Sequence, residues 1–293
     1  MAIKDVKKIG SRGVILTFED DISVYLIHAA KRWFLCDTHL GPQSMKYVKE
    51  YLSMEKNNKE VIVFNSHSDW DHIWGNCAFQ GGIIIGHETC RKRMNEIGPF
   101  EMMKLSEFHC GNVELVLPNV TFSDRMAFVE DEIEFIYAPG HTIDSSLCFD
   151  KKDAVLFVGD LVEYPIPYLD FYDLTAYIKT LDFIKSFPAR AKVSAHSGII
   201  DDDLISRNST YVRDIMEGNP IHLSVYQESL SVHNFNINNR LFLQYESMVR
   251  ETLKENFDYS AFKSSFDDLK KVGYHDLQEA LETYFSKITK SIL

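Results

Sequence analysis

Four candidate metal ligands follow directly on one short apolar segment. Residues 61–64 read Val-Ile-Val-Phe, and the loop after them contains His67, Asp69, Asp71 and His72. The apolar run predicts a buried strand, and loops at the carboxyl ends of strands present ligands in α/β sheets. In an extended loop His67 and Asp69 alternate onto one side, while Asp71 and His72 can point to a neighbouring position. This arrangement suits two adjacent metal ions; the alternative is a polar loop that only caps the following helix.

Three later segments repeat the pattern of an apolar strand that ends in a metal-ligand side chain. A Pro-Gly turn presents His141, a strand ending Val-Gly is followed by Asp160, and a fourth strand ends in His196. Taken singly, a turn histidine or a carboxylate capping a helix would explain each of them. Four strand ends that all carry His or Asp favour a metal site, because such sites need donors held on rigid elements.

Apolar strand patterns and helical patterns alternate over the first two thirds of the chain. The predicted strands are residues 14–18, 22–28, 32–37, 60–66, 82–86, 133–138, 145–149, 154–159 and 192–196. Apolar residues at helical spacing predict helices over residues 44–54 and 174–187. Strands interleaved with helices are typical of a layered α/β domain. We therefore predict an α/β domain over residues 1–205.

After about residue 200 the sequence predicts helices only. Three apolar stripes have helical spacing: Leu241, Tyr245, Met248, Val249 and Leu253; then Phe262, Phe266 and Leu269; then Leu277, Leu281, Tyr284, Phe285 and Ile288. No Pro/Gly/Ser-rich linker separates them from the preceding domain. We therefore expect residues 206–293 to form a helical appendage that is packed on the α/β core.

Charge and cysteine content restrict the functions that are open to the chain. It has 31 Lys plus Arg against 43 Asp plus Glu, a formal net charge of −12, whereas a protein that grips nucleic acid needs a basic surface. Five scattered cysteines without a C-x-x-C pair suit reduced thiols. The polar start of the sequence lacks the apolar stretch of a signal peptide, and no run approaches a membrane span. We expect a cytoplasmic protein that acts on a small molecule and binds neither nucleic acid nor membrane.

Taken in order, these motifs resemble those of the metallo-β-lactamase superfamily of metallohydrolases. The signature of that family is an H-x-H-x-D-H loop, a Gly-His turn, a strand-terminal Asp and a late His. An early Asp-Thr-Gly-like segment is matched here by Asp37-Thr38. The resemblance covers roughly residues 10–200. It implies an αββα sandwich of two sheets flanked by helices, with a dinuclear metal site at one edge.

The resemblance also implies a set of ligands. Site one would comprise His67, Asp69 and His141, site two would comprise Asp71, His72 and His196, and Asp160 would bridge two divalent ions. Asp37 would support the ligand histidines from behind.

One position departs from the family pattern. Asp69 replaces the second histidine of the loop. A carboxylate is a harder donor than an imidazole, which moves the preference from zinc toward iron or manganese. A glutamate at this position is seen in the flavodiiron oxidoreductases of the same superfamily, but this chain is too short to hold their flavin domain. Alternatively, Asp69 does not coordinate and one ion binds.

The leading interpretation is a metal-dependent hydrolase. A hydroxide that bridges the two ions, oriented by Asp71, would attack an ester, thioester, lactone or phosphoester. Aromatic residues near the metal loops could line a substrate pocket or simply pack beneath the appendage: Trp70, Tyr164, Tyr168, Phe171 and Tyr172. Two alternatives stay open. One is a non-haem iron oxidoreductase, and the other is a metal- or effector-binding protein with vestigial catalysis, whose appendage could cover the site or form a homodimer face.

Overall fold

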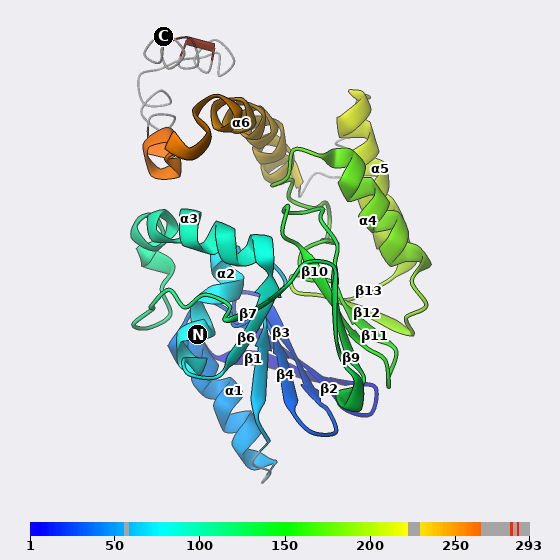
Figure 1. Cartoon of the computed structure of the whole chain (residues 1–293). Coiled ribbons are helices and arrows are strands. Elements are labelled where there is room, and N and C mark those ends of the chain that lie inside the picture. Colours follow the sequence, from blue (N-terminus) through cyan, green and yellow to red (C-terminus); the bar gives the residue numbers. More distant parts are fainter. Residues whose placement is uncertain (56–58, 222–228, 265–281, 284–285, 287–293) are drawn as a thin grey trace.

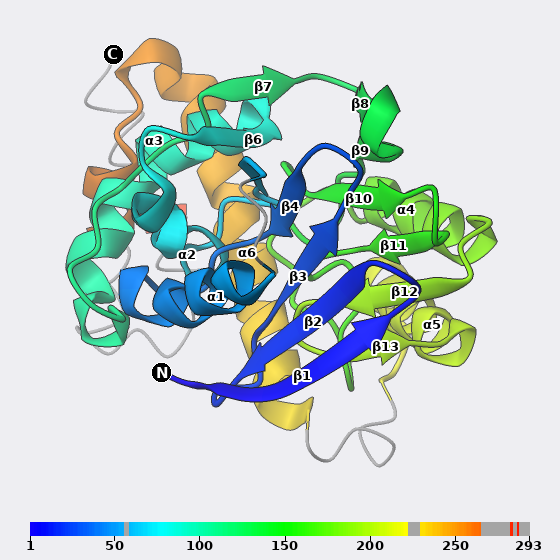
Figure 2. The same cartoon turned by 90° about the horizontal axis from the view of Figure 1, so that it is seen from below.

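The computed structural model, shown in Figures 1 and 2, describes residues 1–55, 59–221, 229–264, 282–283 and 286. Two β-sheets pack face to face, and helices lie outside each of them. The predicted αββα sandwich is confirmed, and helices follow it toward the carboxyl end of the chain. Among the described residues, no helix combines the length and the apolar composition that a membrane span requires.

The first sheet has seven strands in the order of the chain. They are β1 (Ile3–Ile9), β2 (Gly13–Phe18), β3 (Ser23–His28), β4 (Trp33–Cys36), β5 (Val61–Phe64), β6 (Ile83–His87) and β7 (Val120–Phe122). Neighbours from β1 to β4 are antiparallel, and neighbours from β4 to β7 are parallel. The parallel half therefore places the ends of β4 and β5 side by side at one edge of the sandwich.

The second sheet has six strands in the order β13-β12-β11-β10-β9-β8. They are β8 (Arg125–Phe128), β9 (Ile133–Tyr137), β10 (Ser146–Asp150), β11 (Val155–Phe157), β12 (Ala191–Ser194) and β13 (Gly198–Ile200). All neighbours are antiparallel except β11 and β12. Because β11 and β12 run in the same direction, the residues that follow them emerge at the same edge.

The helices of the described residues range from four to 24 residues in length. They are α1 (Pro42–Met54), α2 (Trp70–Ile73), α3 (Glu88–Lys104), α4 (Leu174–Ser186), α5 (Asp202–Glu217) and α6 (Leu230–Leu253), with 3₁₀ turns at Trp74–Phe79, Ser106–Phe108, Val129–Asp131 and Lys254–Asn256. Helix α1 packs on the outer face of the first sheet, and α4 and α5 cover the outer face of the second.

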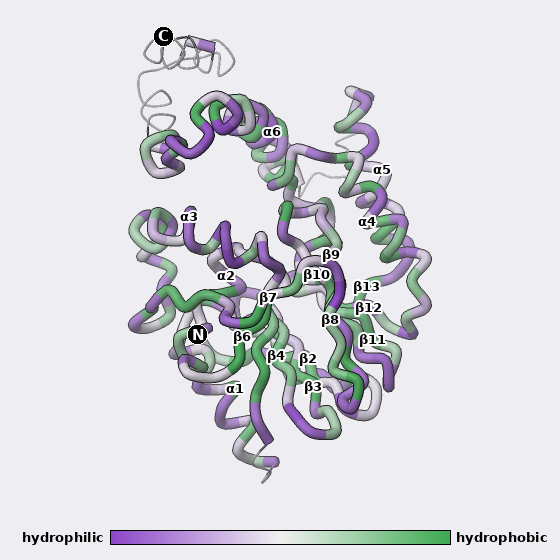
Figure 3. Tube along the Cα trace, viewed as in Figure 1, coloured by the Kyte–Doolittle hydropathy of each residue, from purple (hydrophilic) through white to green (hydrophobic). Residues whose placement is uncertain are grey.

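The side-chain alternation of the strands explains the layers. In β3, Tyr25 and Ile27 face the space between the sheets, while Val24 and Leu26 belong to the cluster under α1. Strands that are buried on both faces read as continuous apolar runs, as β3 to β6 do (Figure 3). Between the sheets, Phe64 of β5 stacks on Phe135 of β9, with their ring centroids 4.2 Å apart.

The nine strands predicted from the sequence are all present, with ends displaced by one or two residues. The strands β1, β7, β8 and β13 were not predicted from the sequence. Strand β1 is an edge strand with four charged residues, so its exposed face hides the strand pattern. The other three have only three or four residues each.

The predicted appendage is described only in part. Its first apolar stripe lies on α6, whereas most of the second and third stripes falls outside the described residues. Helix α5 begins at Asp202 and so runs through the boundary that we placed after residue 205. The division into 1–205 and 206–293 stays a prediction.

One buried ion pair joins the two sheets at the end opposite to the metal-ligand loops. The Arg12 guanidinium lies 2.5 Å from the Asp150 carboxylate, and both side chains are buried. Arg12 precedes β2 and Asp150 ends β10, so the pair connects one sheet to the other. Removing one partner of a buried pair leaves the other charge without compensation.

We therefore predict that Arg12→Ala lowers the free energy of unfolding by about 3–5 kcal/mol. The exposed pair of Lys4 and Asp21 provides the matched control, because Lys4→Ala should cost less than about 1 kcal/mol. Urea unfolding followed by circular dichroism measures both. Equal effects of the two substitutions would contradict this role of the buried pair.

Candidate metal centre

The loops at one edge of the sandwich bring the candidate ligands together from both sheets. The loop after β5 carries His67 and Asp69 and leads into α2, which carries Asp71 and His72. His141, Asp160 and His196 follow β9, β11 and β12 of the second sheet. All four loops follow the carboxyl ends of their strands. The centre therefore lies on the seam between the two sheets.

Three side chains form the first group. The Oδ2 atom of Asp69 lies 3.2 Å from Nε2 of His141 and 3.5 Å from Nε2 of His67. One ligand atom from each residue lies within 4.8 Å of the others, so the group could hold one metal ion. Asp69, the residue that departs from the family pattern, thus lies between the imidazoles of His67 and His141.

A second group of the same kind lies beside the first. The Oδ2 atom of Asp71 lies 3.3 Å from Nε2 of His196 and 3.5 Å from Nε2 of His72. These three residues also meet the geometric requirement for one metal ion. The two groups share no residue, and each combines two residues of the segment from His67 to His72 with one histidine that follows a strand of the second sheet.

Asp160 reaches both groups. Its Oδ2 atom lies 3.0 Å from Nε2 of His72, 3.2 Å from Nε2 of His196 and 3.8 Å from Nε2 of His67. No other carboxylate of the described residues is paired with histidines of both groups. Asp160 thus lies between the two groups, and its role as a bridging ligand stays a prediction.

Hydrogen bonds behind the imidazoles fix how three of them face the centre. The Nδ1 atom of His72 lies 3.0 Å from Oδ2 of Asp37, and Nδ1 of His141 lies 3.1 Å from the carbonyl oxygen of Tyr168. The hydroxyl of Ser66 donates to Asp37 and therefore accepts from Nδ1 of His67, 2.9 Å away. A proton on each Nδ1 leaves the Nε2 lone pair free for a metal ion.

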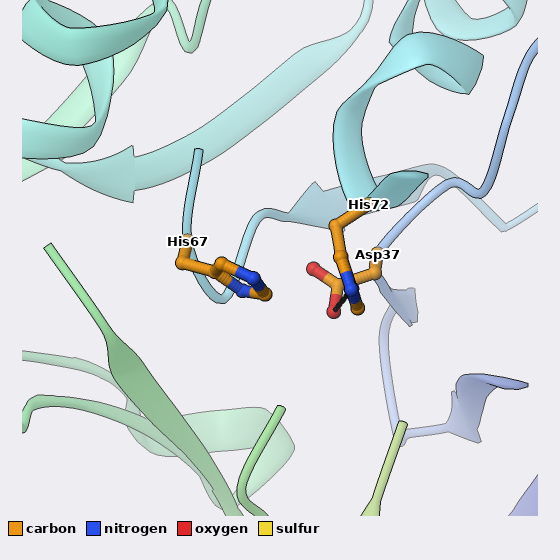
Figure 4. Close-up of side chains that lie close together, drawn as sticks. All are labelled: Asp37, His67 and His72. Atoms are coloured by element: carbon orange, nitrogen blue, oxygen red, sulfur yellow. Dashed lines mark hydrogen bonds and ion pairs between the residues drawn. The ribbon is translucent and has the colours of Figure 1, made fainter. Parts of the chain in front are cut away.

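Figure 4 shows how Asp37 lies against His72, with His67 beside them. The Asp37 carboxylate also accepts the backbone N–H of Ser66 at 2.8 Å. Asp37 is buried, and its carboxylate accepts these hydrogen bonds, so it fixes the orientation of the His72 ring. Its support of metal ligands stays a prediction.

The electrostatics of the cluster require positive charge. Burial opposes protonation of His141, but the hydrogen bond and the charge of Asp69 outweigh it and raise the pKa of His141 to about 10. Against the same effect of burial, the charge of Asp160 raises the pKa of His72 and of His196 well above the ordinary value. The carboxylates therefore hold protons on the imidazoles wherever no other cation is present.

The arrangement fits metal ions better than protons. Nε2 of His67 and Oδ1 of Asp160 are buried and have no hydrogen-bond partner among the described residues. Unpartnered buried polar atoms are costly, and both atoms are metal donors. His/Asp donor sets of this type accept zinc, iron or manganese. The residues that are present thus fit divalent metal ions.

A cavity of about 700 Å³ opens on the cluster, and Trp70 and Tyr168 line it. That this cavity is a substrate pocket stays a prediction. The other predicted pocket residues lie elsewhere. Tyr164 lines a second cavity of about 480 Å³, which also contains His196. Phe171 and Tyr172 line a third of about 280 Å³ between α3 and α6, because the chain turns away after Asp170.

Two charged residues near the centre had no sequence signal. Arg93 of α3 contacts Ser68 and Asp144, both at 3.2 Å, so it ties the first metal loop to the loop that carries His141. Glu163 lies 4.0 Å from Nδ1 of His141, and burial together with the charge of Asp160 raises the pKa of Glu163 to about 7. These contacts join segments that are distant in the sequence, so no local pattern points to them.

The sandwich and its paired His/Asp groups define a metallohydrolase type of centre. The sequence profile of the metallo-beta-lactamase superfamily matches residues 17–196. The chain belongs to this superfamily.

Solved structures agree on the fold. A metallo-beta-lactamase from Pontibacter korlensis is 21% identical, with a TM-score of 0.55 over 72% of this chain and 99% of that one. The DIM-1 metallo-beta-lactamase is 15% identical, with a TM-score of 0.58 over 72% of this chain and 97% of that one. At these identities the likeness concerns the fold alone.

A curated relative carries a different kind of name. The "Putative transcription factor avaE" of Aspergillus versicolor is 27% identical in an alignment 220 positions long, which covers 62% of this chain and 63% of the relative. The chain thus matches less than two thirds of the length of that relative. Superfamily membership and the His/Asp groups support metal-dependent hydrolysis in general.

We predict that Asp37→Asn lowers the affinity for Zn²⁺ by about 10- to 100-fold. The amide presents a donor to His72 and Ser66, which themselves donate to Asp37, so the His72 ring loses its orientation. Competition with a chromophoric chelator measures the dissociation constant.

Asp131→Asn is the matched control. Asp131 is also buried and accepts hydrogen bonds from Lys31 and Arg32, but it precedes β9 at the opposite end of the sandwich. Its loss should lower stability and leave the Zn²⁺ affinity unchanged. An equal loss of affinity in both variants would argue that Asp37 acts only through stability.

Proposed function

We propose that the protein is a hydrolase that uses two divalent metal ions to cleave an ester, thioester, lactone or phosphoester of a small molecule. The observation that carries this proposal is the pair of His/Asp groups with Asp160 between them. Two adjacent ions clamp the attacking and leaving sides of a hydrolytic displacement. The cavity of about 700 Å³ beside them has the size of a small-molecule site.

Each ligand has a distinct task in this proposal. His67, Asp69 and His141 would hold one ion, and Asp71, His72 and His196 the other, with Asp160 in contact with both. When bound, the ions supply Lewis acidity, which polarises the scissile carbonyl or phosphoryl group and lowers the pKa of water.

Asp71 has a second task. It lines the cavity together with Asp69, Asp160, His141 and His196, and it is half-buried. Its carboxylate can accept a hydrogen bond from the attacking water and so orient the lone pair of that water toward the substrate. The ring orientations imposed by Asp37, Ser66 and the Tyr168 carbonyl keep the imidazoles in place while the substrate reacts.

The metal content tests the proposal most directly. We expect about two ions of zinc or manganese per chain when the protein is purified without chelator or added metal and examined by elemental mass spectrometry. Hydrolysis of a panel of esters, lactones and phosphoesters should disappear after dialysis against a chelator and return with the metal. Less than one ion per chain would contradict a dinuclear centre.

The variants Asp71→Ala and His141→Ala should each abolish hydrolysis, by a factor of about 10³ or more, because each removes a metal ligand. Circular dichroism should show an intact fold. Asp182→Ala is the control: Asp182 is an exposed residue of α4 that pairs with Arg213, and its loss should leave turnover unchanged. Turnover like that of the wild type in either ligand variant would refute the assignment.

One observation favours a second candidate, a non-haem iron oxidoreductase. The Asp69 carboxylate lies between His67 and His141 and would complete the first site. Because a carboxylate is a harder donor than an imidazole, it moves the preference toward iron. Iron as the native metal, together with a redox-sensitive absorption band, would favour this candidate over the hydrolase.

The name of the Aspergillus relative supports a third candidate, a regulatory protein that binds metal or an effector without catalysis. Full metal occupancy without turnover of any ester, thioester, lactone or phosphoester would favour it. The net charge of −12 argues against direct contact with nucleic acid, so such a role would act through another protein.

A further inference from the structure

One face of α6 forms a wall of the cavity that holds the metal ligands. Phe235, Asn239 and Phe242 line this cavity, and they are spaced four and three residues apart, which places them on one side of a helix. In Figure 1, α6 lies across the edge of the sandwich where the metal loops are. The helix therefore presents two aromatic rings to the cavity that contains Asp71 and His141.

Hydrogen bonds fix α6 relative to the metal centre. The Asn236 amide donates to the carbonyl of Pro167 and accepts the N–H of Leu169, both at 2.9 Å, and it is fully buried. Between these two residues lies Tyr168, whose carbonyl accepts from His141. The same short segment thus holds a metal-ligand imidazole on one side and α6 on the other.

A neighbouring residue of α6 strengthens this attachment. The Asn239 amide donates to the carbonyl of Leu169 at 2.9 Å and to the Asp170 carboxylate at 2.8 Å. The aromatic face of α6 is consequently held in a fixed position relative to the metal ligands.

Aromatic surface is exposed within the cavity. The rings of Tyr168 and Phe235 meet edge to face with their centroids 5.3 Å apart, yet 39% and 47% of these residues is accessible. Phe100, which is itself buried, and Tyr259 form a second edge-to-face pair that lines the cavity, with their ring centroids 5.8 Å apart. Exposed apolar surface of this kind in a cavity marks a place where a ligand is bound.

We propose that the cavity selects substrates whose acyl group carries an aromatic ring, and that α6 is the element that recognises the ring. This inference rests on the proposed hydrolase function. The ring would stack against Tyr168 and Phe235, while the scissile carbonyl lies at the metal ligands. In the reaction, water adds to the carbonyl carbon of an aromatic thioester and the carbon–sulfur bond breaks, which gives the carboxylate, the thiol and a proton.

The test compares thioesters of one small non-aromatic thiol whose acyl group is acetyl, hexanoyl or phenylacetyl. For the metal-loaded full chain, kcat/KM for phenylacetyl should exceed that for hexanoyl by about threefold to tenfold, because aromatic pairs interact more strongly than their buried area alone accounts for. The acids formed are measured by chromatography.

Two variants of α6 test whether Phe235 causes the preference for the phenylacetyl group. Phe235→Leu keeps an apolar side chain but removes the ring, so the ratio of phenylacetyl to hexanoyl turnover should fall toward one. Ile237→Ala is the matched control, because Ile237 lies on the same helix, is also 47% exposed and does not line the cavity. It should leave the ratio unchanged. A wild-type ratio near one, or a ratio that Phe235→Leu does not change, would overturn the inference.

A binding measurement separates this inference from the proposed function. Calorimetric titration of the metal-loaded chain with phenylacetate and with hexanoate requires no turnover. Phenylacetate should bind about threefold to tenfold more tightly, and Phe235→Leu should remove the difference. If no ester, thioester, lactone or phosphoester is cleaved, the hydrolase proposal fails while the titration still decides the selectivity. Equal affinities for the two acids would overturn the selectivity even where hydrolysis is found.

Discussion

The metal-ligand edge of the protein is organised by one constraint, which is the mutual repulsion of three carboxylates that are gathered in one cluster. Asp69, Asp71 and Asp160 all lie within 4 Å of the imidazole nitrogens of the same cluster. Three carboxylates gathered around the same imidazoles, away from bulk water, are stable only when cations lie between them. The imidazoles supply that charge as protonated groups in the absence of metal, and divalent ions supply it better. The cluster therefore couples folding of the loops to cation binding.

This coupling extends to the sandwich because the centre crosses its seam. His67 and His72 follow a strand of the first sheet, whereas His141, Asp160 and His196 follow strands of the second. Each of the two groups contains residues that follow strands of both sheets, so the geometry within each group is set by how the sheets pack, and close-packed interiors transmit small displacements. Buried contacts far from the metal loops, such as the stacked rings between β5 and β9, belong to the structure that holds the ligands.

The sequence predicted the parts of the centre that depend on local pattern. A strand that ends in a ligand can be recognised from its apolar run and the next few residues, which is why His67, His141, Asp160 and His196 were found. Arg93 and Glu163 could not be found in this way, because their partners are brought to them only by tertiary packing. The positions of the aromatic residues that follow Asp160 could be predicted only in part, for the same reason. Tyr168 faces the metal cavity, but the chain turns before Phe171 and Tyr172, and nothing in their types reveals the turn.

A ligand set that is shared across a superfamily does not by itself select a substrate, since one fold and one type of site serve many reactions. Selection must come from the walls of the cavity, and here those walls come largely from α3, the segment after Glu163 and α6. Helix α6 lies outside the part of the chain that matches the family profile. Its asparagines hold it to the segment that also supports His141. The helix outside the profile is therefore joined by hydrogen bonds to residues inside it, so the cavity wall that α6 contributes and the support of His141 depend on the same short segment.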